Sequence, residues 1–260
     1  MTNTIKRNAL LANIQHNDRY GNNTLLFLKN EITGIFNRFE AQSYGSPVTE
    51  ILFIPYAFDQ ADYASYKRSV ENIFSPLGIT VKSITETQGN IDETVLLTNA
   101  QAIVTGGGNF EYLLKKLKSK NLINIIRQKI LDGFPYVGWN EGSEIVSPVI
   151  MQNFSESFLC FNIISFQLCT GFIENDSHTS ALKNFLMSNP TISKAACLTQ
   201  ITEDKGSGIW LEDVKSGLAT GTDSGGGSLP GKTPLLIYKI QNNNLAKEPI
   251  GDPNNLPLNV

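Results

Sequence analysis

Short apolar runs alternate with amphipathic segments along the first half of the chain, and this alternation limits the possible folds more than any other feature. The apolar runs predict strands, and the segments between them have the spacing of helices. Such an alternation is typical of a mostly parallel sheet covered by helices. The predicted strands are 9–14, 49–56, 80–84, 101–105 and 134–137, and the predicted helices are 24–39, 60–74, 110–120 and 122–131.

The pattern is looser in the second half of the chain. It predicts strands at 158–161, 163–168, 195–201 and 234–240, a helix at 180–187 and a hairpin at 209–219. Residues 221–231 are rich in Gly and Ser but lack the lysine-serine ending of a nucleotide-binding loop. We find no internal repeat and no linker. We therefore expect one α/β domain of three layers over 1–241, followed by an Asn- and Pro-rich tail over 242–260.

Composition excludes several classes of function. The formal net charge of −3 gives no reason to expect nucleic acid or an anionic membrane as a partner. The three cysteines lack metal-like spacing, and two histidines are too few for a histidine-rich metal centre. We expect no metal and no cofactor. The chain shows neither a secretory leader nor an apolar stretch of membrane-spanning length, so we expect a cytoplasmic location.

The segment Gly138-Trp139-Asn140-Glu141-Gly142 follows a predicted buried strand and precedes a segment that can open a helix. A strand-turn-helix of the form G-x-S-x-G holds a nucleophilic serine on a tight turn. Here the central residue is Asn140, whose amide cannot be deprotonated to attack a carbonyl at neutral pH. The sequence therefore predicts a catalytic elbow without its ordinary nucleophile.

A glycine run, Gly106-Gly107-Gly108, followed by Asn109, lies between a predicted strand and a predicted helix. Ligands bind at such strand ends in open α/β sheets, and exposed backbone N–H groups there can hold a carboxylate or an oxyanion. The alternative is a tight turn that needs glycines but holds no ligand.

Several segments, in this order and spacing, resemble the peptidase E family of α-aspartyl dipeptidases and their cyanophycinase relatives. The resemblance covers about 9–240, and its motifs are 51–57, 75–78, 103–109, 110–114, 136–139, 166–168 and 201–203. It implies a fold related to class I glutamine amidotransferases. It also implies cleavage of peptides that begin with aspartate, by a serine and a histidine with an acidic third member.

When the family pattern is carried over, its serine falls on Asn140 and its histidine on Gly171. The acidic member is expected between 150 and 158, where this chain offers Glu156. The resemblance further implies that one glycine of the run and Glu141 supply oxyanion-hole donors. Losing serine and histidine together points to a naturally diverged site.

Other side chains remain candidates for rebuilt chemistry. Glu141 and Glu144 are close in sequence, which predicts either a raised pKa for one of them or two acids favoured at a helix N-terminus. Ser143 is a replacement nucleophile or a capping serine, and Cys169 is a reactive or a buried thiol. Either histidine can contact the site or lie on the surface; these are His16 and His178.

Three functions stay open at this stage. The first is a catalytically silent protein that binds a small peptide or amino-acid-like ligand at the elbow and the glycine run. The second is a hydrolase or acyl transferase with a rebuilt site. The third is an interaction protein that uses the fold as a scaffold. A homodimer is compatible with each of them.

Overall fold

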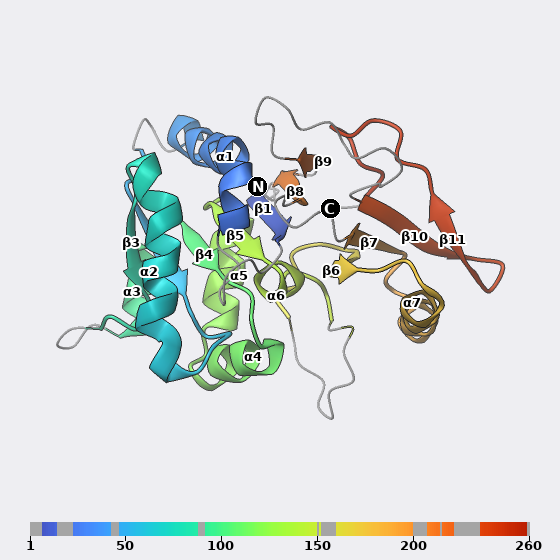
Figure 1. Cartoon of the computed structure of the whole chain (residues 1–260), viewed down its shortest axis with the longest axis horizontal. Helices are drawn as coiled ribbons and strands as arrows, with labels where there is room; N and C mark the ends of the chain where they lie inside the picture. The colour runs from blue at the N-terminus through green and yellow to red at the C-terminus, as the bar shows by residue number, and fades with distance from the viewer. Residues whose placement is uncertain are drawn as a thin grey trace, which may run out of the picture.

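A computed structural model of the chain describes residues 7–14, 23–42, 47–87, 92–149, 151, 160–199, 207–213, 215–220 and 235–258. Figure 1 shows two groups of strands, each with its own helices. The predicted fold class, an α/β domain built on a mostly parallel sheet, is confirmed. Within the described ranges, every helix falls short of the length or the apolarity that a bilayer crossing requires.

The larger group is a seven-stranded sheet with the order β3-β2-β4-β5-β1-β8-β9. Its first five strands run parallel, and β8 and β9 add an antiparallel hairpin next to β1. Because the parallel strands point the same way, the carboxyl ends of β1, β4 and β5 meet at one edge. The strands are β1 (Asn8–Asn13), β2 (Glu50–Ile54), β3 (Thr80–Ser83), β4 (Ile103–Thr105), β5 (Tyr136–Trp139), β8 (Ser207–Glu212) and β9 (Lys215–Thr220).

Helices cover both faces of this sheet, and the alternation of side chains along β1 decides which residues meet them. Leu10 and Ala12 belong to the same buried cluster as α1 and α2, whereas Ala9 and Leu11 belong to the cluster of α3, α4 and α5. The helices are α1 (Lys29–Gln42), α2 (Tyr63–Phe74), α3 (Glu93–Asn99), α4 (Phe110–Ser119) and α5 (Ile123–Leu131), with 3₁₀ turns η1 (Asn23–Leu28), η2 (Gln60–Asp62) and η3 (Ser75–Leu77).

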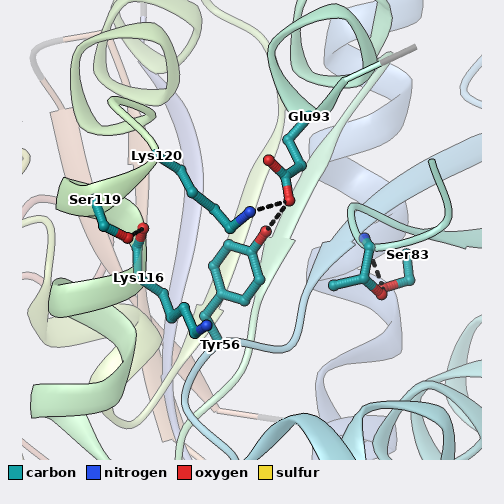
Figure 2. Close-up of polar contacts among 7 residues, drawn as sticks. Tyr56, Ser83, Glu93, Lys116, Ser119 and Lys120 are labelled. Carbon is teal, nitrogen blue, oxygen red and sulfur yellow. Dashed lines mark hydrogen bonds and ion pairs between the residues drawn. The ribbon is translucent and has the colours of Figure 1, made fainter. Parts of the chain in front are cut away.

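Helix α3 is one element that the sequence analysis did not predict. Its N-cap is Asp92, whose side chain accepts a hydrogen bond from the backbone N–H of Val95. Glu93 then accepts a hydrogen bond from the Tyr56 hydroxyl, 3.1 Å between oxygens, and forms an ion pair with Lys120 (Figure 2). This network joins α3 to the loop after β2 and to the end of α4.

The second group is a four-stranded sheet with the order β11-β10-β7-β6, covered by α7. In Figure 1 it lies to the right of β1, and the single turn α6 lies between the two sheets. Strands β6 and β7 are parallel, and the other pairs are antiparallel. The elements are α6 (Glu141–Glu144), β6 (Gln167–Phe172), α7 (Asp176–Ser188), β7 (Lys194–Thr199), β10 (Leu235–Gln241) and β11 (Asn244–Glu248).

Two expectations for the second half differ from the structure. The described part of 160–166 forms no strand, and β6 begins only at Gln167. Phe161 and Ile163 are buried there, but their N–H groups donate to the carbonyls of Ile145 and Val146 after α6 rather than to a strand. The segment expected as a tail instead contributes β11 and buries Leu256. The Gly- and Ser-rich run 221–231 lies outside the described residues.

Candidate functional site

The elbow lies between β5 and α6, and Asn140 forms its apex with φ 50° and ψ −118°. Residues other than glycine rarely adopt a positive φ, and such strain clusters at functional turns. The two flanking glycines are required by the space around them. A Cβ on Gly142 would lie 2.1 Å from the carbonyl oxygen of Thr105, and one on Gly138 would lie 2.4 Å from that of Gly142. The chain therefore retains the backbone of a tight strand-turn-helix.

The side chain of Asn140 is bonded to the backbone of β1's end. Its Oδ1 accepts a hydrogen bond from the N–H of Ile14 at 3.0 Å, and its Nδ2 donates to the carbonyl of Ile14 at 3.1 Å. The backbone N–H of Asn140 donates to Ala12, which continues the parallel pairing of β1 with β5. The side-chain amide of Asn140 thus extends the hydrogen bonding between β1 and β5 by one more pair of bonds, and both of its polar atoms have protein partners.

The glycine run follows β4 and packs directly against the elbow. A Cβ on Gly107 would lie 2.8 Å from Asn140 Cβ and 2.8 Å from Glu141 Oε2, so only glycine fits there. Gly108 has φ 146°, and its N–H is held beside the elbow. Asn109 is the N-cap of α4, because its Oδ1 accepts a hydrogen bond from the N–H of Tyr112.

The carboxylate of Glu141 accepts a hydrogen bond from the backbone N–H of Gly108, with 2.7 Å between nitrogen and Oε2. Hydrogen bonds to an ionised acceptor are short and stronger than neutral ones. One of the N–H groups of the glycine run, which the sequence analysis expected to hold a carboxylate or an oxyanion, is therefore bonded to the chain's own side chain in this structure.

Two further polar residues of α6 form hydrogen bonds with neighbouring strands. Ser143 is fully buried, and its hydroxyl donates to the carbonyl of Ala12 at 2.9 Å. Glu144 Oε1 accepts hydrogen bonds from the N–H and the hydroxyl of Thr170 at 2.6 and 3.0 Å, which ties α6 to β6. Burial raises the pKa of the Glu144 carboxyl to about 7, the charge of Glu141 adds to this rise, and the Thr170 hydrogen bonds oppose it.

Comparison with known proteins identifies the family. The profile described as Peptidase family S51 matches residues 26–205, well over half of the chain. The chain belongs to peptidase family S51. Peptidase E of Nostoc sp. is 30% identical over 200 residues, which cover 72% of this chain and 77% of that protein. Peptidase E of Haemophilus influenzae is 32% identical over 154 residues, which cover 54% of this chain and 69% of that protein.

A solved structure agrees with the fold of this S51 chain. The crystal structure of a peptidase from an acI-B1 Actinobacterium gives a TM-score of 0.64 at 14% sequence identity. The match covers 96% of this chain and 97% of that one. At this identity the likeness concerns the fold alone, and it extends beyond the first sheet to nearly the whole chain.

Cys169 of this S51 chain is a buried thiol in the second sheet. It is the register partner of Cys197 on the neighbouring parallel strand, and its Sγ lies 3.7 Å from Met151 Sδ. The neighbouring Cys197 thiol and burial hold the pKa of Cys169 well above its ordinary value. A thiol in such surroundings is a poor nucleophile, because the thiolate is the reactive form.

Gly171 lies on β6 next to Thr170, at the position to which the resemblance assigns the histidine. It has φ 61°, and a Cβ added there would meet no atom within 4 Å in the part of the chain that the structure describes. Its N–H donates to Asn13 Oδ1, and Asn13 Nδ2 donates to the carbonyl of Thr199. Asn13 therefore connects the end of β1 to β6 and β7. The sequence analysis did not single out Asn13, although its position at a strand's carboxyl end was a usable signal.

The structure places His178 in the first turn of α7, where it contacts its own neighbourhood. Its Nδ1 accepts a hydrogen bond from the N–H of Ile173 at 3.4 Å, and its ring packs against Phe172. None of its contacts in the described ranges is with the elbow or the glycine run. His16 and Glu156 lie outside the described residues.

A pocket of about 320 Å³ lies beside Gly108, and the sequence analysis did not foresee it. It is framed by the loop after β2 and by the start of α4, which the sheet brings together. Its lining residues are Ala57, Phe58, Asp59, Asp62, Gly108, Asn109 and Tyr112. Among the described residues, no group of three or more His, Cys, Asp or Glu side chains is arranged to hold a metal ion.

Proposed function

We propose that this S51 chain binds a small peptide or amino-acid-like ligand beside its glycine run and does not hydrolyse it by a serine triad. The observation that carries this proposal is the pairing of the Asn140 amide with both backbone groups of Ile14. An amide at the elbow supplies no nucleophile, and this amide already has a structural task.

The surroundings of the elbow support the same function. Hydrolysis of a peptide needs donors for the developing oxyanion, and loss of one donor typically lowers kcat by about 10²–10³. Here the N–H of Gly108 is bonded to Glu141. The hydroxyl of Ser143 is bonded to Ala12 and buried, so it is a poor replacement nucleophile. These contacts favour binding over a rebuilt hydrolase.

The pocket beside Gly108 supports a small ligand. Its volume of about 320 Å³ is at the lower end of the range for small-molecule sites. Asp59 and Asp62 provide carboxylates for an amino group, and Tyr112 provides a ring for an apolar side chain. A free amino group beside a short side chain is the common feature of amino acids and small peptides.

The first test is turnover of a dipeptide library, followed by mass spectrometry, with Asp-X and Glu-X members included. We expect no turnover beyond the residual acceleration of roughly 10³–10⁴ over water that binding and an oxyanion site can give without a triad. Turnover well above that level, lost in Asn140→Ala or Cys169→Ala, would overturn the proposal in favour of a rebuilt catalytic site.

The second test asks whether the pocket binds members of the same library. A ligand that binds only the native state raises the melting temperature, and the rise grows with the logarithm of the ligand concentration relative to Kd. We expect Tyr112→Ala to weaken that stabilisation, because Tyr112 lines the pocket and is 43% exposed. Met187→Ala is the matched control, since Met187 is an exposed apolar residue of α7 and does not line the pocket. Equal loss in both variants would count against this pocket.

A further inference from the structure

We propose that Glu141 is a specificity-determining residue, which holds the donor N–H of the glycine run and thereby excludes ligand carboxylates from the elbow. The inference rests on the proposed function, because it defines the charge of the ligand that the site accepts. The ligand class that follows is a neutral or cationic group at the elbow, with any carboxylate of the ligand turned away from it.

The contact between Glu141 and Gly108 is built into the backbone on both sides. Glu141 is the first residue of α6, directly after the strained Asn140. Gly108 has φ 146°, and a Cβ there would lie 2.5 Å from the carbonyl oxygen of Ala57. The side chain and the N–H are therefore both attached to segments with little freedom to move, at a separation of 2.7 Å.

The fit around the carboxylate is close. A Cβ on Gly107 would lie 2.8 Å from Glu141 Oε2, so the absence of a side chain at Gly107 leaves the space that the carboxylate fills. The same Cβ would lie 2.8 Å from Asn140 Cβ, which means that the glycine run and the elbow are in contact. A carboxylate of a ligand can reach the N–H of Gly108 from this side only by displacing Glu141.

Electrostatics strengthens the exclusion. An approaching carboxylate meets the negative charge of Glu141 at the donor itself. The charge of Glu141 also contributes to the raised pKa of the neighbouring Glu144, whose main cause is burial. Like charges at a few ångströms, away from bulk water, repel strongly. An uncharged or cationic group faces no such opposition.

The experiment measures binding of N-acetylglycine at fixed ionic strength, through the backbone amide resonance of Gly108 in NMR spectra. We expect Glu141→Ala to bind this carboxylate at least tenfold more tightly than the wild type. The matched neutral probe, N-acetylglycinamide, is expected to gain less than twofold. Glu111→Ala is the control for net charge, because Glu111 is a solvent-facing acid of α4 that pairs with Lys115.

A second variant keeps the test decisive if the alanine variant is poorly folded. Glu141→Gln retains an acceptor for Gly108 and removes the charge, so we expect a gain of at least threefold for N-acetylglycine. Equal affinity in the wild type and in both variants would overturn the inference, as would an equal gain in Glu111→Ala. Failure of the proposed function is a separate result, because it appears as turnover of dipeptides by the wild type.

Discussion

The elbow and the end of β6 are joined by the hydrogen bonds of Glu144 to Thr170, but they are built in opposite ways. At the elbow, the side chains of Asn140 and Ser143 are bonded to the backbone of β1's end. At Gly171 there is no side chain, and a Cβ there would meet no atom of the described residues within 4 Å.

This difference suggests which parts of the site are tied to folding and which are free to vary. A polar side chain that replaces part of a sheet ladder cannot be changed without leaving buried backbone groups unpaired. A glycine with open space beside it carries no such constraint. We infer that the fold depends on the polar side chains of the elbow, whereas at Gly171 it depends only on the backbone, whose N–H donates to Asn13.

The substitution Asn140→Ala is expected to have the largest effect on stability. This substitution leaves the N–H and the carbonyl of Ile14 without the partners that Asn140 gives them, and Ile14 is buried. We expect a loss of about 2–4 kcal/mol in the free energy of unfolding, measured by urea denaturation. A loss below about 0.5 kcal/mol would mean that the amide is not structural, and the contrast with Gly171 would fail.

A glycine at the same position separates the loss of the side-chain hydrogen bonds from the strain of the backbone at residue 140. Asn140→Gly also removes both side-chain hydrogen bonds, but it relieves the cost of φ 50° in a non-glycine residue. Positive-φ strain of this kind is worth about 1–3 kcal/mol. Asn140→Gly is therefore expected to be less destabilising than Asn140→Ala, and the reverse order would show that the strain is absent.

The fold of the first half could be predicted because its apolar runs are buried strands whose pattern is local. The strands β1 to β5 and the helices α1, α2, α4 and α5 all overlap the expected segments, although β5 begins two residues later than expected and the start of the expected helix 24–39 is the 3₁₀ turn η1. Helix α3 was missed because it has only seven residues, although Asp92 is an ordinary N-cap signal. In the second half, apolar content at 160–166 indicated burial correctly but strand pairing wrongly.

The candidate site was predictable in its backbone but not in its side-chain partners. The glycines around Asn140 marked the turn, because only glycine fits a close approach of two backbones. The bond from Asn140 to Ile14 joins residues 126 positions apart, and no local pattern reports it. The same holds for Glu141 and Gly108, which are 33 positions apart. Such pairs follow from the strand order of the sheet, which composition and periodicity do not determine.

The next largest effect is on the pH dependence of stability, and it concerns Glu144, which links the elbow to β6 through Thr170. The Glu144 carboxyl has a pKa of about 7 instead of 4.5, so the native state keeps a proton that the unfolded chain releases between these values. Stability from this group is therefore present at low pH and is lost as pH rises through this window. Glu144→Gln should remove that loss, by as much as about 3 kcal/mol between about pH 5 and about pH 8.

The measurement for this prediction is urea denaturation of both proteins at the two pH values. Glutamine keeps an acceptor for Thr170, so the tie between α6 and β6 can persist in the variant. Glu111→Gln is the control, since Glu111 lies on the exposed side of α4 and its substitution should leave the pH slope nearly unchanged. If the free energy of unfolding changed with pH equally in the wild type and in Glu144→Gln, Glu144 would not be the group that titrates. The charge of Glu144 would then not couple the elbow to β6.

The smallest expected effect is on Gly171→Ala, and it is the direct counterpart of the substitution at Asn140. With φ 61° and no atom of a described residue within 4 Å of a new Cβ, the expected cost is that of a left-handed backbone alone, about 1 kcal/mol. Gly78→Ala is a matched control, because Gly78 has φ 74° and is equally uncrowded at the end of η3. Similar losses for both substitutions would show that the β6 side still has room for a side chain. A loss at Gly171 that clearly exceeds the loss at Gly78 would show that the fold depends on this side in the same way that it depends on the elbow.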